Sequence, residues 1–335
     1  MKQPRILITG VAGLLGSHLS RYLLDQGYDC AGIDDLSGGF ADFVDPRLTA
    51  KHKFFQLNLL KHRQLENIFA TFRPDAVFHL AAYAAEGLSP FIRRFNYQNN
   101  LICSVNVINF CLKYHVKKLI FTSSMAVYGQ GQPPFSEDQI PKPADPYGVA
   151  KFSVEQDIQL AADQFGLDYS IVRPHNVIGI YQNIWDRYRN VIGIWIRKSI
   201  AGENIGIFGD GTQKRAFSDI KYYLEPFRQL IDGGSREIFN LGADKEFKLL
   251  DVAKMVQAEA NKFGKQPQIE FLEPRHEVKD AYCSHLKAKK ILNFVDQTNL
   301  ETTIHEMFAW AMTQPARKVK KKQYELTENI YSYWK

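Results

Sequence analysis

The segment DPYGVAK, residues 145–151, places a tyrosine four positions before a lysine, after a proline-rich loop and at the start of a stretch with a helical pattern. Side chains four residues apart lie on one face of a helix, so Lys151 is expected behind the phenol ring of Tyr147. A nearby cation favours a phenolate anion, which can act as a general base. The spacing alone is common among surface residues, so its meaning depends on the rest of the chain.

A glycine-rich turn near the start of the chain supplies that context. The apolar run RILIT, residues 5–9, leads into Gly10, Gly13 and Gly16, and the helical pattern SHLSRYLLDQG follows. Glycines in a strand-to-helix turn let backbone N–H groups approach a pyrophosphate at the positive end of the helix. Asp34 ends the next apolar run about twenty residues further on, which is the spacing of a dinucleotide-binding fold. We therefore predict dinucleotide binding here rather than a merely structural turn.

The acidic residues after the second apolar run indicate which dinucleotide is bound. Asp34 is expected to accept hydrogen bonds from both hydroxyl groups of the adenosine ribose. Its negative charge, reinforced by Asp35, would repel a 2′-phosphate. The sequence therefore favours NAD over NADP as the cofactor.

The elements that must position these residues follow from the order of the sequence patterns. Short apolar runs alternate with amphipathic helical stretches, which predicts an α/β fold, a Rossmann-like doubly wound parallel sheet covered on both faces. The predicted strands are 5–9, 30–34, 53–57, 76–80, 118–123 and 169–173. After residue 174 we expect helices near 188–201, 221–232, 249–263 and 300–313, with strands near 205–208, 214–219, 237–241 and 268–272.

These patterns divide the chain into three parts. Residues 1–174 are predicted to form the NAD-binding domain, and residues 175–315 a smaller, partly interwoven lobe for the substrate. Residues 316–335 form a basic, aromatic tail. The run RKVKKK, residues 317–322, carries five of the positive charges behind the net charge of +6, so the remainder of the chain is nearly neutral. We expect a solvated basic run followed by a docked aromatic end, with an acidic membrane or a protein as the alternative contact, and no nucleic-acid partner.

Composition places the chain among globular proteins, with 45% hydrophobic and 23% charged residues in 335. The N-terminus has the pattern of neither a signal peptide nor a membrane span, so a cytoplasmic location is the default expectation. The four cysteines, at positions 30, 103, 111 and 283, form no CxxC pair. Buried free thiols are therefore expected, rather than disulfides or a metal site.

Several motifs together resemble the extended short-chain dehydrogenase/reductase family. They are the GxxGxxG spacing, IDDLSGG at 33–39, HLAAYAA at 79–85, TSSMAVYG at 122–129 and YGVAK at 147–151. More narrowly, they are similar to nucleotide-sugar epimerases of the UDP-galactose 4-epimerase type. The likeness spans about residues 4 to 313, and a serine followed by YxxxK in this order is its most specific part.

The resemblance implies a catalytic set of Ser124, Tyr147 and Lys151. Tyr147 would take the proton of a sugar hydroxyl, with Ser124 sharing that proton and Lys151 also holding the nicotinamide ribose. An ordinary tyrosine has a pKa near 10, and lowering it to about 7 requires about 4 kcal/mol of differential stabilisation. Lys151 and the positive nicotinamide are the expected sources of that stabilisation.

The resemblance also implies two sets of binding residues. The cofactor set is Gly10, Gly13, Leu14, Leu15, Gly16, Asp34, Asp35, Asn58, Leu59, Leu80, Ala81, Ala82, Asn99, Ser123, Tyr147, Lys151 and Pro174. The substrate set is Ser124, Asn176, Asn190, Arg215 and Arg275, in which the arginines suit a diphosphate because a guanidinium pairs with phosphate oxygens. Asn99 is further expected to position the loop after the fifth strand.

Some positions depart from the family pattern. Asn58 stands where many relatives have an aspartate that contacts adenine. Val278 stands where a ribose-binding aspartate often lies, with Glu277 or Asp280 as substitutes. The aromatic and basic segment 183–198 is also unusual, so the base and the sugar of the substrate stay open.

The residues after Ser124 distinguish between reactions. Family dehydratases and decarboxylases commonly have acidic residues there, whereas Met125 and Ala126 cannot transfer protons. We therefore predict an NAD-dependent nucleotide-sugar epimerase that inverts C4 through a 4-keto sugar. A nucleotide-sugar 4-dehydrogenase or keto-reductase is the alternative, and a non-catalytic dinucleotide sensor is a third hypothesis. A homodimer through helices 97–114 and 147–164 is expected, with Val105, Ile108, Phe152 and Ile158 as apolar contact positions.

Overall fold

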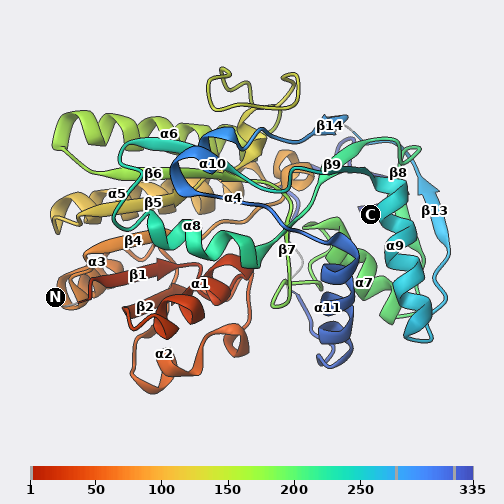
Figure 1. Ribbon diagram of the computed structural model, residues 1–335, viewed down its shortest axis with the longest axis horizontal. Helices are drawn as coiled ribbons and strands as arrows, with labels where there is room; N and C mark the ends of the chain where they lie inside the picture. Colours follow the sequence, from red (N-terminus) through yellow and green to blue (C-terminus); the bar gives the residue numbers. More distant parts are fainter. Residues whose placement is uncertain (1–2, 276–277, 320–321, 335) are drawn as a thin grey trace.

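A parallel sheet of seven strands forms the centre of the protein in the computed structural model, which describes residues 3–275, 278–319 and 322–334 (Figure 1). The strand order is β11-β6-β5-β4-β1-β2-β3. The strands are β1 (Arg5–Thr9), β2 (Asp29–Asp34), β3 (Phe54–Gln56), β4 (Ala76–His79), β5 (Lys118–Thr122), β6 (Tyr169–Pro174) and β11 (Glu237–Leu241). The six strands predicted for the first domain are confirmed, and so is the doubly wound fold.

Each face of the sheet packs against its own set of helices. Side chains alternate along a strand, so Ile6 and Ile8 of β1 enter one core and Leu7 enters the other. The first core is completed by α1 (Leu14–Asp25), α2 (Pro46–Ala50), α8 (Leu224–Gln229) and α10 (Leu286–Leu292). The second core is completed by α3 (His62–Phe72), α5 (Cys103–Lys113) and α6 (Pro146–Phe165). Burial on both faces explains why these strands read as continuous apolar runs.

Strand β11 comes from the part of the chain predicted to form the partly interwoven second lobe, but it lies in the central sheet. Residues 237–241 return to the main sheet and pair in parallel with β6, so that Ile238 lies opposite Ile171. Phe239 is fully buried in the first core. A short apolar run predicts a strand. It does not predict which sheet the strand joins, because that depends on contacts with residues far away in the sequence. Through this strand, the part of the chain after residue 174 is interwoven with the part before it.

The second lobe lies beside the carboxyl ends of the central strands (Figure 1). Its core is formed by α7 (Val191–Ile200), α9 (Leu249–Lys262) and α11 (Leu300–Met312), around the buried Trp195 and Ile304. Short strands pair at its edges: β8 (Ile205–Phe208) with β13 (Ile269–Leu272), and β9 (Lys214–Ala216) with β12 (Glu246–Lys248) and β14 (Asp280–Ala281). A further pair of short parallel strands is formed by β7 (Val177–Ile178) and β10 (Ser218–Asp219).

The aromatic end of the tail is docked on the body, as predicted. Ile330 and Trp334 are buried in a cluster with Tyr83, Leu88 and Phe91. The basic run departs from the expected solvated state at Arg317, whose guanidinium bonds to Asp42 and lies 4.3 Å from the ring centre of Phe40. The positive charge of the run does not predict this contact, because Asp42 lies 275 residues before Arg317 in the sequence.

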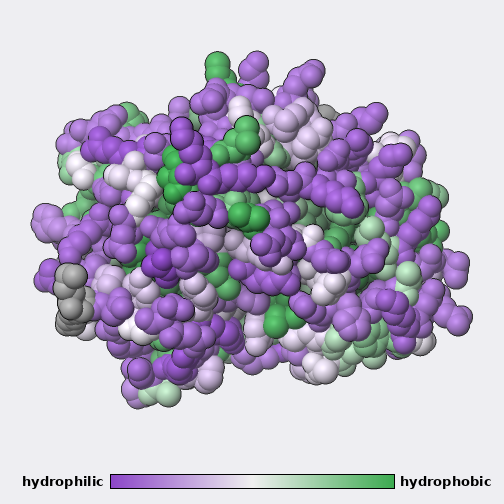
Figure 2. Space-filling view, in the orientation of Figure 1, coloured by the Kyte–Doolittle hydropathy of each residue, from purple (hydrophilic) through white to green (hydrophobic). Residues whose placement is uncertain are grey.

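The surface and the cysteines agree with the composition. All four cysteines are free and buried, which confirms that prediction. Figure 2 shows a face covered mostly by polar side chains, with apolar residues scattered over it. Among the residues that the structure describes, none of the helices combines the length and the apolar character that crossing a membrane requires.

Candidate active site

A cavity of about 940 Å³ lies between the carboxyl ends of the central strands and the second lobe. Loops that follow parallel strands meet at this edge, which is where open α/β sheets bind ligands. Every residue of the predicted catalytic, cofactor and substrate sets lines this one cavity. The structure therefore brings together positions that are up to 265 residues apart in sequence, from Gly10 to Arg275.

The glycine-rich turn borders the cavity and is packed too closely for side chains at Gly10 and Gly16. Gly10 has a φ of +75°, and a Cβ atom added to it would lie 2.8 Å from the Cα atom of Ala81. A Cβ atom on Gly16 would lie 2.2 Å from the carbonyl oxygen of Gly10. Helix α1 begins directly after Gly13 without a side-chain cap, and its first residues line the cavity, where uncapped N–H groups can meet a ligand. This cradle fits the pyrophosphate of a dinucleotide.

Asp34 and Asp35 are held in place at the end of β2. The two carboxylate oxygens of Asp34 accept hydrogen bonds from the backbone N–H groups of Ala12, at 3.0 Å, and Leu36, at 2.8 Å. Burial raises the pKa of Asp34. Asn58 donates to Asp35 at 2.7 Å, so the amide that replaces the family's aspartate orients its acidic neighbour. Each oxygen of a carboxylate keeps a further acceptor site for a ribose hydroxyl.

Helix α6 presents Tyr147 and Lys151 on one face, as their spacing predicted. The helix begins at Pro146, and the side chain of Asp145 caps it by accepting from the N–H of Gly148 at 3.0 Å. The ammonium nitrogen of Lys151 lies 6.0 Å from the ring centre of Tyr147. It donates a hydrogen bond to the carbonyl oxygen of Thr122, at the end of β5, at 2.7 Å. Lys151 is thereby fixed behind the phenol.

The protein without NAD+ makes the phenol of Tyr147 less acidic, because burial opposes the stabilisation expected from Lys151 and the nicotinamide. Burial raises its pKa above the ordinary value, and the negative charge of Glu86 raises it further, whereas a hydrogen bond with Ser124 lowers it. Burial also lowers the pKa of Lys151 to about 7. A sequence shows which charges are neighbours but not how strongly they are desolvated. The stabilisation of a phenolate must therefore include the positive charge that NAD+ brings.

The shifted pKa of Lys151 predicts a pH-dependent stability for the cofactor-free protein. Between about pH 7 and 10.5 the unfolded chain binds the lysine proton and the folded chain does not, so wild-type stability rises with pH there. The variant Lys151→Met has no titrating side chain at this position, so its stability lacks this pH-dependent change. We expect its advantage in melting temperature over wild type to be largest below pH 7 and to shrink toward pH 10. Melting curves at pH 6 and 9 test this, and a constant difference would contradict it.

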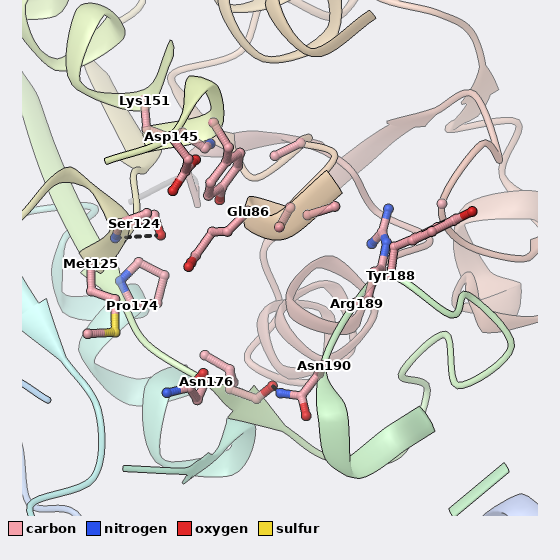
Figure 3. A pocket seen from close by; sticks show the side chains of 18 of the residues that line it. Glu86, Ser124, Met125, Asp145, Lys151, Pro174, Asn176, Tyr188, Arg189 and Asn190 are labelled. Atoms are coloured by element: carbon pink, nitrogen blue, oxygen red, sulfur yellow. Dashed lines mark hydrogen bonds between the residues drawn. The ribbon is translucent and has the colours of Figure 1, made fainter. Parts of the chain in front are cut away.

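The two serines after β5 differ in their surroundings. Ser124 begins a short turn, and its hydroxyl oxygen accepts a hydrogen bond from the N–H of Ala126 at 3.1 Å (Figure 3). The hydroxyl of Ser123 is buried at the cavity and has no hydrogen-bond partner among the described residues. A buried polar atom without a partner carries a desolvation cost that a bound ligand can remove. Ser123 therefore fits its predicted place beside the cofactor.

Asn99 lines the cavity, while its neighbour Asn100 holds a different loop from the predicted one, the loop after β4. Asn100 accepts a hydrogen bond from the N–H of Tyr83 at 2.8 Å and donates to its carbonyl oxygen at 3.2 Å. Both asparagines lie in a π-helical turn, Gln98–Ile102, between α4 (Arg93–Tyr97) and α5. A π-helical turn contains one more residue than an α-helical turn, and a regular helical pattern does not reveal it.

Two predicted substrate residues use part of their hydrogen-bonding capacity within the protein. Asn190 caps helix α7, accepting from the N–H of Ile192 at 3.1 Å. The side chain of Asn176 donates to the carbonyl oxygen of Ala216 at 3.0 Å. Both side chains still point toward the cavity in Figure 3.

The predicted diphosphate arginines come from two segments of the second lobe. Arg215 donates to the backbone carbonyl oxygen of Val278 at 2.6 Å, and also to those of Lys214 and Lys279. These bonds orient its guanidinium at the cavity wall. The guanidinium of Arg275 lies 4.6 Å from the ring centre of Phe208.

The candidate substitutes for the family's ribose-binding aspartate have different outcomes. Val278 itself lines the cavity. The carboxylate of Asp280 accepts a hydrogen bond from the N–H of Lys214 at 3.1 Å. Glu277 lies outside the described residues.

Sequence reasoning missed several polar residues at the cavity. Glu86, Tyr188 and Arg189 extend into it from the second-lobe side and from the loop after β4 (Figure 3). Arg189 is held by the buried Asp186 at 3.3 Å, and Asp186 also accepts a hydrogen bond from Tyr83 at 3.0 Å. The unusual aromatic and basic composition of segment 183–198 was the only sequence feature that pointed to Tyr188 and Arg189. Glu86 brings a carboxylate into the cavity, although no acidic residue directly follows Ser124 in the sequence.

Comparisons with known proteins agree with this arrangement. The model of the "NAD dependent epimerase/dehydratase family" matches residues 6–242, and the chain belongs to that family. This confirms the resemblance found in the sequence and NAD as the cofactor. A UDP-glucuronate 4-epimerase from Thermodesulfobacterium geofontis is 28% identical over 314 residues, which cover 91% of this chain and 95% of that protein.

Solved structures give the same result. The structure of UDP-glucose 4-epimerase with UDP-glucose from Thermotoga maritima is similar with a TM-score of 0.85 and 29% identity, covering 92% of this chain and 98% of its own. A UDP-glucose 4-epimerase from Thermus thermophilus in complex with NAD is similar with a TM-score of 0.85 and 25% identity, covering 92% and 99%.

Proposed function

We propose that this protein is an NAD-dependent UDP-sugar 4-epimerase. The observation that carries the proposal is that Ser124, Tyr147 and Lys151 share one cavity with the glycine-rich cradle and with Arg215. The relatives named above act on UDP-glucose or UDP-glucuronate, according to their names, and this supports uridine as the base. These names do not specify the sugar, because glucose and glucuronate differ in the group at C6.

The residues of this chain have distinct tasks in such a reaction. NAD+, when bound, supplies a hydride acceptor for C4 and a positive charge near the phenol. Tyr147 takes the proton of the C4 hydroxyl, and Ser124 holds that hydroxyl by a hydrogen bond. Lys151 stabilises the phenolate from behind. Arg215 and Arg275 hold the diphosphate while the 4-keto sugar turns and exposes its other face, so the intermediate does not leave.

Incubation with a panel of UDP-, GDP- and CDP-sugars tests the proposal. NMR would show a C4 epimer, and absorbance at the NADH band would show any net reduction of the cofactor. We expect epimerisation of a UDP-sugar without accumulating NADH. If NADH rises with substrate and no epimer forms, the protein is a 4-dehydrogenase and the proposal is wrong.

We also propose a homodimer, located in the cytoplasm and serving carbohydrate biosynthesis. Of the predicted contact positions, Ile108 and Ile158 are buried in the second core and cannot contact a partner. Exposed apolar residues on the same two helical segments are Ile102, at 45%, Val149, at 38%, and Leu160, at 66%. Light scattering of the wild type and of Leu160→Glu tests the dimer, since a charge at that position should favour the monomer.

A further inference from the structure

The tail is fixed to the first lobe by specific hydrogen bonds. Helix α4 has no side-chain cap of its own. The carboxylate of Glu325 takes that place, accepting from the backbone N–H groups of Arg94 and Phe95 at 2.8 and 3.0 Å. The N–H of Glu325 also donates to the carbonyl oxygen of Phe91 at 2.8 Å. These hydrogen bonds hold the tail in place, and they also give partners to backbone groups at the start of helix α4.

A second anchor lies at the far end of the tail. Arg187 donates to the carbonyl oxygen of Trp334 at 2.6 Å, and Tyr324 donates to the same oxygen at 3.1 Å. The ring of Trp334 is only 3% exposed and packs edge-on against Phe91 and Tyr188, with centroids 6.1 and 5.2 Å apart. Burial of an indole ring of this size stabilises the docked position substantially.

The chain between these anchors faces the cavity. Leu326, Glu328, Asn329, Tyr331 and Trp334 all line the cavity that contains Tyr147. They contribute to its wall, whereas the neighbouring Tyr333 does not line it.

The position of Trp334 identifies which part of the cavity the tail encloses. A Cβ atom added to Gly87 would lie 3.4 Å from the indole ring and 3.8 Å from Arg275. Gly87 follows Glu86, whose charge acts on the phenol of Tyr147. Tyr331 packs near Phe208, with centroids 6.4 Å apart, and Phe208 supports Arg275. The tail thus lies between the reacting end of the cavity and the arginine proposed for the diphosphate.

We infer that residues 326–334 belong to the nucleotide-sugar site, and that Tyr331 and Trp334 contact the sugar-diphosphate part of the substrate and select among sugars by size. The inference rests on the proposed function. Aromatic walls offer a rigid apolar surface to one face of a sugar ring and leave little room for a larger substituent. Because the tail is already docked, little ordering entropy opposes binding.

Affinity measurements on matched tail variants test the inference. Titration of UDP-glucose and UDP-N-acetylglucosamine into NAD-loaded protein should show that Tyr331→Ala weakens binding of the preferred sugar about tenfold, equivalent to 1.4 kcal/mol. Trp334→Ala should weaken it at least as much. The ratio of the two affinities should also move toward the larger sugar, because the wall has receded. NAD affinity should be unchanged, since the glycine-rich cradle lies at the other lobe.

Tyr333→Ala is the matched control, because Tyr333 also packs against Phe208, with ring centroids 5.6 Å apart, but does not line the cavity. Its affinities should stay within about twofold of wild type, and its melting temperature measures the general cost of losing a tail ring. Equal effects of Tyr331→Ala and Tyr333→Ala, or no effect of Tyr331→Ala and Trp334→Ala, would overturn the inference. A failure of the proposed function looks different: the full chain would bind a UDP-sugar without forming an epimer, and the affinities would still decide the role of the tail.

Discussion

Replacing Tyr147 by phenylalanine should lower the turnover of a UDP-sugar by about 100- to 10,000-fold, the usual contribution of a positioned acid or base. The phenylalanine ring keeps the packing of a side chain that is only 4% exposed, so the fold should persist. The cradle at Gly10 and Gly16 is unaffected, and NAD should bind as in wild type. Epimer formation followed by NMR, together with an NAD titration, measures both quantities.

Tyr223→Phe is the control for this experiment. Tyr223 is as deeply buried as Tyr147, but its hydroxyl bonds to Ser218 and to the carbonyl oxygen of Leu241, away from the cavity. Its loss should cost about 1 kcal/mol of stability and leave turnover intact. If Tyr147→Phe retains full turnover, Tyr147 is not the base and the proposed mechanism fails.

The second large effect concerns a buried ion pair beneath the site. Arg173 of β6 donates to both carboxylate oxygens of Glu155, at 3.0 and 2.6 Å, and to the hydroxyl of Tyr128 at 2.8 Å. Arg173 and Glu155 are 2% and 1% exposed. Glu155→Ala would leave the guanidinium buried without its anion, so we expect a loss of about 3–5 kcal/mol in the free energy of unfolding. Denaturant titration without NAD measures it.

A double variant separates the ion pair from general packing. In Glu155→Ala with Arg173→Met, no uncompensated charge remains, and much of the lost stability should return. If the double variant is as unstable as Glu155→Ala alone, the cost comes from the cavity and not from the charge. Glu155 also raises the pKa of Lys151, one helical turn away, so the single variant should depress that pKa further.

The sequence predicted the local parts of this protein well. Strands β1 to β6, the turn at Gly10 and the shared face of Tyr147 and Lys151 depend on periodicity and backbone conformation, which are local properties. The motifs that resemble a known family supplied the predicted binding and catalytic sets, and every residue of those sets lines the cavity. Their assigned roles stay predictions, because geometry places them at the cavity without showing a ligand.

What the sequence could not supply was burial and long-range pairing. The phenol of Tyr147 was expected to become acidic through Lys151 and the nicotinamide together, and the sequence does not show the desolvation that acts in the opposite direction. Strand β11, the capping of α4 by Glu325 and the approach of Arg189 to the cavity all join segments far apart in the chain. No local pattern encodes such contacts.

The return of β11 to the main sheet determines whether the lobes can be separated. A fragment that ends at residue 174 would expose the unpaired edge of β6 and would lack Phe227 and Phe239, which fill the first core. An open edge next to uncovered apolar side chains promotes aggregation. The lobes therefore cannot be exchanged as independent modules, and a chimera that grafts another substrate lobe must retain residues 224–241 from this chain.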